Sequence, residues 1–271
     1  MTSPLLRAKD HAAPSVFRPE ALLREARRQR RLPDTPVPHA CLLDPDGDIV
    51  AHMTRTGRAR RHPGWACYHT ELVTFDLPGL LHPVGAIGRA VGAPFAVLVA
   101  EQLFASGCRV LVSVTSAGRI AESLPGAPHF VLIERALRDE GTSHHYLPPA
   151  PFAAMPEPAL IAGVMARLAR EAPGLRVLRG ATWTTDAPFR ETEAAIAAAR
   201  AAGCLAVEME AAALYAHAAA ARRRVLCIAH VTNAMGRDEG DFEKGEADGA
   251  ADALRLLGAA FRALAAPGLD R

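Results

Sequence analysis

From residue 93 onward the chain alternates between stretches with helical spacing and short apolar runs, and this alternation constrains its fold more than any other feature. Residues 93–106 repeat apolar side chains at helical spacing and are followed by Gly107, so they are predicted to form a helix. The apolar run at 109–114 is predicted to be a buried strand. Continuous apolar strands separated by helices favour a parallel or mixed sheet that is covered on both faces. We therefore expect a three-layer α/β fold with a mixed central β-sheet and helices on both faces.

The remaining elements follow from the same signals. Further helices are expected over 159–170, 191–202, 210–222 and 247–264, and further strands over 175–182, 204–207 and 225–231. Residues 130–134 fit either a strand or a short helix. Earlier strands are expected over 40–43, 48–54, 65–75 and 83–87, with 48–54 and 65–75 forming a meander. Residues 1–38, rich in Pro and Arg, are interpreted as an N-terminal extension with one helix over 19–31, and residues 39–271 as the main domain.

The composition excludes several classes of protein. Half of the 271 residues are apolar and 22% are charged, which suits a buried core and not a disordered chain. The 31 basic and 29 acidic residues nearly balance, whereas nucleic-acid binders usually carry a larger excess of positive charge. The arginines between residues 18 and 31 favour a solvated helix face over a phosphate-binding arm. No apolar run approaches the roughly 20 residues that span a bilayer. The first residues lack a secretory signal core, so we expect a cytoplasmic protein that binds neither nucleic acid nor membrane.

The cysteines and histidines carry no metal-binding or disulfide signal. The five cysteines are odd in number and none are spaced as C-x-x-C, and the eleven histidines include no H-E-x-x-H. We expect no metal ion and no organic cofactor.

The expected sheet also predicts where a ligand binds. Sheets of this class bind ligands at the carboxyl ends of their strands. That rule selects the segments 115–118, 184–190 and 232–236, each of which follows an expected strand.

The sharpest motif is V-E-M-E-A-A-A-L-Y at 207–215, where an apolar strand turns into an Ala-rich helix. Glu208 and Glu210 stand near the start of that helix, where the helix dipole favours negative charge. Two interpretations remain open from the residues alone. The pair caps the helix, or one carboxylate accepts hydrogen bonds from the vicinal hydroxyls of a sugar.

Together with the strand I-A-H-V-T-N at 228–233, this motif resembles the signature of the nucleoside phosphorylase family. That family includes purine nucleoside phosphorylases, uridine phosphorylases and the methylthioadenosine and adenosylhomocysteine nucleosidases. The resemblance extends to the turn Gly92-Ala93-Pro94, to V-S-V-T-S-A-G at 112–118 and to W-T-T-D-A-P-F at 183–189. It covers roughly residues 40–265 in the family's order and implies the fold expected above.

The resemblance implies a role for each residue of the motif. Glu210 would bind the ribose 2′- and 3′-hydroxyls, Met209 would pack under the ribose, and Glu208 would be a further partner in the same motif. Glu210 is therefore expected to be a catalytic and substrate-binding residue.

The resemblance also implies contacts to the base and to phosphate. Phe189 would stack on the base, unless it is an ordinary core residue. Asn233 stands where purine-specific members place an aspartate that protonates the purine, and an amide cannot act as that acid. This difference favours a 6-oxopurine or a pyrimidine, with Asn233 assisting the departure of the base. Ser116 matches the hydroxyl that contacts phosphate, unless it is a plain turn residue.

Three residues depart from the family's phosphate site. Leu43 replaces a glycine, Gly47 replaces an arginine, and Ser113 replaces a second arginine. A phosphate dianion needs cationic or N–H partners. Four arginines are candidates to supply the missing charge: Arg55, Arg58, Arg89 and Arg119, of which the last two stand beside the relevant segments.

The resemblance implies cleavage of the N-glycosidic bond of a nucleoside. Phosphorolysis to base and pentose 1-phosphate, with inorganic phosphate as co-substrate, is the leading expectation. The alternatives are a nucleosidase that uses water and a non-catalytic nucleoside-binding protein. Members of the family usually form oligomers, so the resemblance also implies a homo-oligomer.

Overall fold

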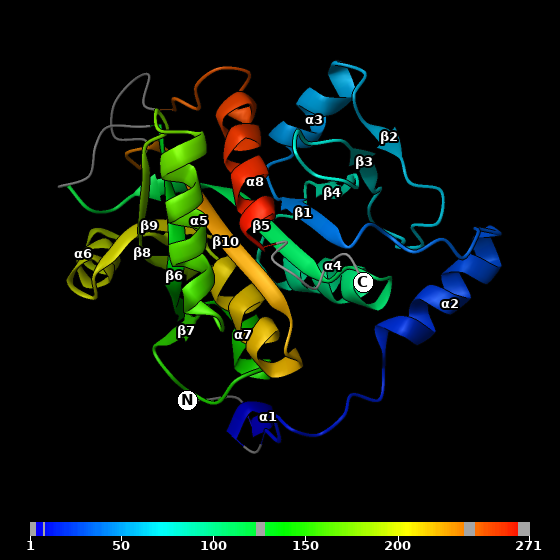
Figure 1. Ribbon diagram of the computed structural model, residues 1–271. Helices are drawn as coiled ribbons and strands as arrows, with labels where there is room; N and C mark the ends of the chain where they lie inside the picture. Colours follow the sequence, from blue (N-terminus) through cyan, green and yellow to red (C-terminus); the bar gives the residue numbers. More distant parts are fainter. Residues whose placement is uncertain (1–3, 8, 123–127, 236–241, 265–271) are drawn as a thin grey trace.

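The computed structural model describes residues 4–7, 9–122, 128–235 and 242–264 of the chain (Figure 1). The described residues form a mixed sheet with these strands: β1 (Ala40–Asp44), β2 (Arg60–Arg61), β3 (Val73–Phe75), β4 (Val84–Gly88), β5 (Val110–Arg119), β6 (His129–Asp139), β7 (Phe152–Ala154), β8 (Val177–Thr185), β9 (Cys204–Glu208) and β10 (Arg224–Asn233). The helices are α1 (Pro4–Arg7), α2 (Pro19–Arg30), α3 (Asp48–Arg55), α4 (Ala93–Ala105), α5 (Pro158–Glu171), α6 (Glu193–Ala201), α7 (Ala211–Ala221) and α8 (Ala250–Leu264), with 3₁₀ turns η1 (Thr142–His145) and η2 (Pro188–Arg190).

Five of the strands form a closed ring. The sheet runs β2-β3-β4-β1-β5-β9-β8-β6-β10, and β10 also pairs with β5, so β5, β9, β8, β6 and β10 form a ring. Strand β5 holds the ring together because it is ten residues long. One of its edges pairs with β10, whereas the other pairs with β1 over 110–113 and with β9 over 118–119. Within the described residues no strand pairs with that second edge at 114–117, so β5 has a gap between β1 and β9.

Helices cover both faces of the sheet, as the sequence predicts. Helices α5 and α8 pack against each other on one face, and α4 and α7 pack together on the other (Figure 1). Helix α7 can lie close to its neighbours because its first eight residues, Ala-rich and including Leu214 and Tyr215, are all buried. Strand β1 lies between these layers with Leu42 and Leu43 fully buried.

Helix α2 of the N-terminal extension packs on the main domain through a small apolar cluster. Leu23 and Ala26 of α2 are buried against Ala66, with Leu32 and Ala105 packed around them. Arg30 donates a hydrogen bond to the carbonyl of Cys67 at 2.8 Å. The expected helix at 19–31 is thus confirmed as α2. No helix among the described residues is long and apolar enough to cross a membrane. All five cysteines are buried and free.

The prediction of a strand at 48–54 is wrong, because α3 occupies 48–55. The buried side chains Ile49 and Met53 are four residues apart, which is a helical spacing. The Asp44 carboxylate accepts hydrogen bonds from the N–H groups of Gly47 and Val50, at 3.2 and 2.9 Å. These bonds satisfy N–H groups at the start of the helix that no helical carbonyl can reach. The hydrogen bonds of Asp44 at the start of α3 therefore outweigh the preference of this short apolar, β-branched run for a strand.

Other differences concern strand lengths. Of the expected strand 65–75, only 73–75 belongs to the sheet, and the antiparallel meander is built by β2, β3 and β4. The ambiguous segment 130–134 is part of strand β6. The segment 115–118, expected as a loop, continues β5, because β10 pairs with it from Thr115↔Ala229 to Gly118↔Asn233, with an irregularity in β10 between Val231 and Asn233. The connection at 147–158 contains the short strand β7.

Candidate active site

The residues singled out by the motif lie where several strands end together. Glu208 is the last residue of β9 and is level with Thr184 of β8. Val207 of β9 pairs with Gly118 of β5, and Gly118 pairs in turn with Asn233 of β10. The gap in the edge of β5 therefore opens beside the end of β9, as expected for a ligand site in a sheet of this class.

Glu208 is the residue that caps helix α7. One carboxylate oxygen accepts hydrogen bonds from the N–H groups of Glu210 and Ala211, at 2.8 and 2.7 Å. The other accepts from the hydroxyls of Thr182 and Thr184, at 3.1 and 2.5 Å. The side chain is buried, and that burial raises the pKa of Glu208. Of the two interpretations of the motif, helix capping applies to Glu208.

Glu210 lies on the other side of the turn and does not cap α7. Its Oε1 accepts the N–H of Gly92 at 2.7 Å, and its Oε2 accepts the hydroxyl of Thr115 at 2.8 Å. The residue is 1% exposed. Burial, and then the neighbouring charge of Glu208, raise the pKa of Glu210 to about 8. A carboxylate that is desolvated this strongly and has a second carboxylate beside it is typical of a functional site.

A backbone N–H group next to the Glu210 carboxylate is hydrogen-bonded to the side chain of an aspartate. Asp46, in the turn after β1, accepts the N–H of Ser116 at 2.7 Å. Ser116 lies in the gap of β5, so the gap is bridged by a carboxylate from the β1 turn. Asp44 caps α3, and burial raises the pKa of its carboxyl to about 7. Asp48 pairs with Lys244 at 2.5 Å.

A small cavity lies among these groups. It measures about 20 Å³ and is lined by Asp46, Thr115, Ser116 and His230, among others. A cavity needs about 10–15 Å³ on this measure to hold one water molecule. The cavity therefore has room for one water molecule.

His230 forms one wall of that cavity. It lies on β10 directly across from Ser116. Its ring stacks on Phe130 with centroids 4.5 Å apart, and burial lowers its pKa to about 4. The imidazole is therefore neutral at pH 7 and does not supply the charge of a missing arginine.

The base-side residues are placed less closely together. Asn233 Oδ1 accepts the N–H of Met235 at 2.9 Å, which closes a local turn, and its Nδ2 donates to the hydroxyl of Thr232 at 3.3 Å. The Met235 sulfur lies over Gly118, only 2.5 Å from where a Cβ would stand. Phe189 is 99% exposed on η2, so it is not a core residue. Met209 is half-buried.

The two candidate replacement arginines differ in position. The Arg89 side chain lies across Gly47, where an added Cβ would be 2.8 Å from its Cγ. Arg89 thus fills the space beside the residue where the family carries an arginine. Arg119 is the last residue of β5 and pairs with Ala206 of β9. Ser113 is buried, and its hydroxyl has no hydrogen-bond partner.

Sequence reasoning missed three groups of this site: Asp46, Thr115 and the N–H of Gly92. The contact of Asp46 depends on how the turn after β1 meets the gap of β5, which the sequence does not show. Thr115 stands next to Ser116 in the segment V-S-V-T-S-A-G, of which the resemblance singled out only Ser116. The residues 236–241, at the end of one expected loop, lie outside the described residues.

Comparison with known proteins agrees with this architecture. The family model described as the phosphorylase superfamily matches residues 51–263. Uridine phosphorylase from Vibrio fischeri is 18% identical, with a TM-score of 0.69 over 84% of this chain and 93% of that one. The same enzyme complexed with 6-hydroxy-1-naphthoic acid gives a TM-score of 0.70 at 18% identity, over 85% and 93%. Purine nucleoside phosphorylase from Toxoplasma gondii, in complex with immucillin-H, gives 0.70 at 15% identity, over 85% and 92%. No curated protein sequence shows a significant match.

Proposed function

Because the chain belongs to the phosphorylase superfamily, we propose that it cleaves the N-glycosidic bond of a nucleoside, with water rather than phosphate as the attacking group. The retained part of the family signature supports the choice of bond. Glu210 is buried beside the gap of β5 and is held by two donors that preorganise its carboxylate. In this proposal Glu210 accepts the ribose hydroxyls, Met209 packs under the sugar, and Glu208 supports the turn that presents them.

The observation that carries the choice of water is the hydrogen bond from Ser116 N–H to Asp46. A phosphate oxygen would need that donor, and the donor already holds a carboxylate. Asp46 stands between the end of β1 and the start of α3, and its carboxylate would repel a phosphate dianion in a partly buried site, which is costly. The cavity of about 20 Å³ beside Asp46 fits a single water.

The reaction then balances with the residues at hand. One oxygen of Asp46 is held by Ser116, and the other accepts a proton from water as the water oxygen bonds to C1′. The C1′–N bond breaks and its electrons leave with the base, which takes a proton from solvent. Glu210 binds the sugar on which positive charge develops. Asn233 donates a hydrogen bond to the departing base, and Phe189 stacks on its face.

The test is the release of free base from a nucleoside panel, measured with and without inorganic phosphate. Equal release in both conditions is expected. Asp46→Asn keeps an acceptor for Ser116 but removes the base, and should lower kcat by roughly 10²-fold or more. Asp48→Asn, which changes a neighbouring aspartate paired with Lys244, is the matched control. Release that depends on phosphate would contradict the use of water, and no release from any nucleoside would favour a binding protein.

One observation favours phosphorolysis as the second candidate. The Arg89 side chain lies over Gly47, and its backbone has a φ of +64°, which is strained for a residue with a Cβ. A guanidinium held there can bind phosphate in a bidentate manner. If base release requires phosphate, Arg89→Ala should raise the apparent KM for phosphate, and Arg119→Ala tests the other candidate in the same way.

We also propose that the protein is a homo-oligomer. Leu5, Phe17 and Leu98 are 79%, 72% and 39% exposed and line one pocket between the N-terminal segment and α4. Exposed apolar patches of this kind mark interaction sites in soluble proteins. Light scattering should give a mass that is a multiple of 28.7 kDa, and Phe17→Asp should shift the population toward the monomer.

A further inference from the structure

A second cavity lies at the opposite end of the sheet from the candidate active site. It measures about 720 Å³ and is lined by the residues that enter β1 and β4 and by side chains of α5 and α8. Strand β1 begins at Ala40 beside this cavity and ends at Asp44 beside the active site. We call this cavity the basic groove. Its volume is within the roughly 300–1,000 Å³ typical of small-molecule sites.

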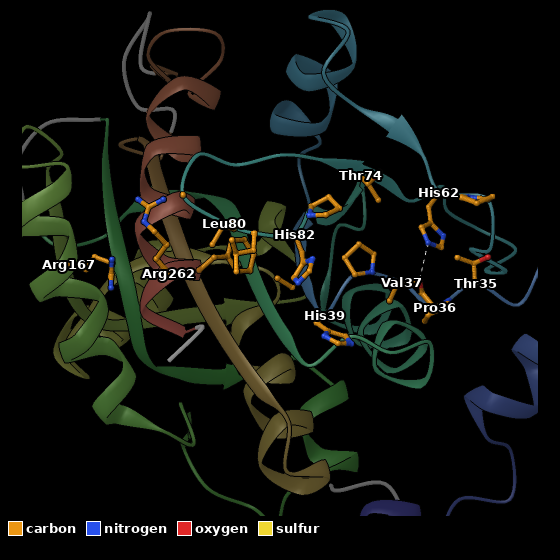
Figure 2. Close-up of a pocket in the computed structure, with 17 residues that line it drawn as sticks. Thr35, Pro36, Val37, His39, His62, Thr74, Leu80, His82, Arg167 and Arg262 are labelled. Carbon is orange, nitrogen blue, oxygen red and sulfur yellow. Dashed lines mark hydrogen bonds between the residues drawn. The ribbon is translucent and has the colours of Figure 1, made fainter. Parts of the chain in front are cut away.

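The ionisable side chains that line the groove are all basic. They are His39, His62, His82, Arg167 and Arg262. Figure 2 shows Arg167 and Arg262 at one end, His62 at the other, and His39 and His82 between them. This arrangement is the reverse of the aspartate-rich turn at the active site.

The two arginines at one end keep a net positive charge. Glu171, which lies behind them, accepts hydrogen bonds from Arg167 at 2.7 Å and from Arg262 at 3.0 Å. One carboxylate therefore balances two guanidinium groups. Arg262 also donates to the carbonyl of Pro78 and lies over Gly79, which fixes its position. Among the described residues Arg167 hydrogen-bonds only to Glu171, so it keeps N–H groups for a ligand.

The rest of the groove is mostly apolar and rigid. Half-buried Leu80 contributes apolar surface over the buried ring of Phe261, and Leu81 stands at the rim with 86% of its surface exposed. Prolines 36, 38, 63 and 83 restrict the backbone of the walls. His62 is fixed by its backbone contacts: Nδ1 accepts the N–H of Gly64 at 3.2 Å, and Nε2 donates to the carbonyl of Pro36 at 3.1 Å. A preformed apolar groove with a cationic end is complementary to an amphipathic anion.

We propose that the basic groove binds a small amphipathic anion, with its apolar body along Leu80 and Leu81 and its carboxylate or phosphate head at Arg167 and Arg262. This site is separate from the one that cleaves nucleosides, and it takes a ligand of a different chemical class.

The probe for this proposal is 8-anilinonaphthalene-1-sulfonate, an aromatic anion whose fluorescence rises in apolar surroundings. The full chain is titrated with it and, in parallel, with N-phenyl-1-naphthylamine, which lacks the sulfonate. We expect saturable binding of one sulfonate per chain, at least fivefold tighter than the neutral compound. Arg167→Gln should remove that preference. Arg170→Gln, on the same helix but outside the groove, should leave it unchanged.

Two further measurements decide the location and the head group. Leu81→Asp places a negative charge at the rim without disturbing the core, and should weaken binding of the sulfonate at least fivefold. Octanoate and octyl phosphate should displace the probe and octanol should not; the better competitor identifies a carboxylate or a phosphate head. Equal affinity for the neutral compound, displacement by octanol, or no effect of either groove variant would overturn the proposal.

Discussion

Two glutamates that are adjacent in the motif have separate tasks. Glu208 accepts the N–H groups at the start of α7, whereas Glu210 turns toward Gly92 and Thr115. The sequence shows that both stand at a strand–helix junction, and it predicts that one of them is functional. It does not show which one caps the helix, because that depends on the side-chain direction at each position. Asp46 was beyond sequence reasoning for a related reason, since its partner Ser116 is 70 residues away.

Glu210→Gln should raise the stability of the protein and lower its activity. Burial raises the pKa of Glu210 to about 8, against an ordinary value of 4.5. The folded protein therefore holds a proton that the unfolded chain releases, so this group lowers stability increasingly as pH rises from about 4.5 to about 8. Glutamine removes that dependence. We expect the variant to gain roughly 1–3 kcal/mol at pH 8 and almost nothing at pH 4.5, measured by urea unfolding.

The same substitution should lower kcat/KM by roughly tenfold or more when it is measured above pH 8, where Glu210 is ionised, because a charged hydrogen bond to the sugar contributes about 1.5–3 kcal/mol. Glu193→Gln, an exposed change at the start of α6, is a control for the removal of a charge. Full activity in Glu210→Gln would exclude the ribose-binding assignment.

Asn233→Asp tests the base assignment without breaking the local turn. A carboxylate can accept the N–H of Met235 as the amide oxygen does, so the fold should persist. A carboxyl beside a purine can share a proton with it, so the variant should shift preference toward 6-aminopurines. The measurement is the ratio of kcat/KM for adenosine and inosine. An unchanged ratio with unchanged stability would mean that Asn233 serves the turn alone.

At the scale of elements, segments with a clear apolar pattern of their own were predicted, including the short strands β1, β4 and β9, whereas segments whose conformation depends on a distant partner were not. Helices α4, α5 and α7 and strands β8 and β10 follow from apolar spacing because their own side chains decide their conformation. The prediction of a strand over 48–54 is wrong because the hydrogen bonds of Asp44 at the start of α3 outweigh a weak local preference. Ser116, Ala117 and Gly118 have little strand propensity, and they extend β5 only because β10 pairs with them.

Helix α7 should depend on its cap. Glu208→Ala would leave the N–H groups of Glu210 and Ala211 without their acceptor in a buried site. Unsatisfied buried groups cost about 1–3 kcal/mol each in mutational data, so we expect the unfolding free energy to fall by about 2 kcal/mol or more. Glu208→Gln retains one acceptor oxygen and should lose less. Equal stability of the alanine and glutamine variants would contradict the capping role.

At the scale of the whole molecule, buried ionisable groups predict how stability depends on pH. Burial raises the pKa values of Asp44 and Glu191 to about 7 and that of Glu210 to about 8. It lowers those of His217 and His230 to about 4. The raised pKa values of the carboxyl groups make stability fall as pH rises. The lowered pKa values of the histidines make stability rise with pH up to about pH 6.5.

The two effects oppose each other between about pH 4.5 and 6.5, and only the carboxyl groups act above that range. We therefore expect Tm to change little up to about pH 6.5 and to fall between pH 6.5 and 8, measured by calorimetry. The double variant Asp44→Asn/Glu210→Gln should flatten that fall. A Tm that rises from pH 6.5 to 8 in the wild type would show that these groups are not buried as described.

The ring of strands also affects the order in which parts of the protein fold. Its closure rests on two residue pairs, Gly118↔Val207 and Arg119↔Ala206, which join segments about ninety residues apart. Contacts between such distant segments form late, since the entropy of closing a long loop is lost before the contact is gained. Glu208 ends β9 and Glu210 follows it closely, so the pairing of β9 with β5 brings Glu210 to Thr115. A chain whose other helices and strands had formed would still lack this arrangement, so the candidate site is completed when the ring closes.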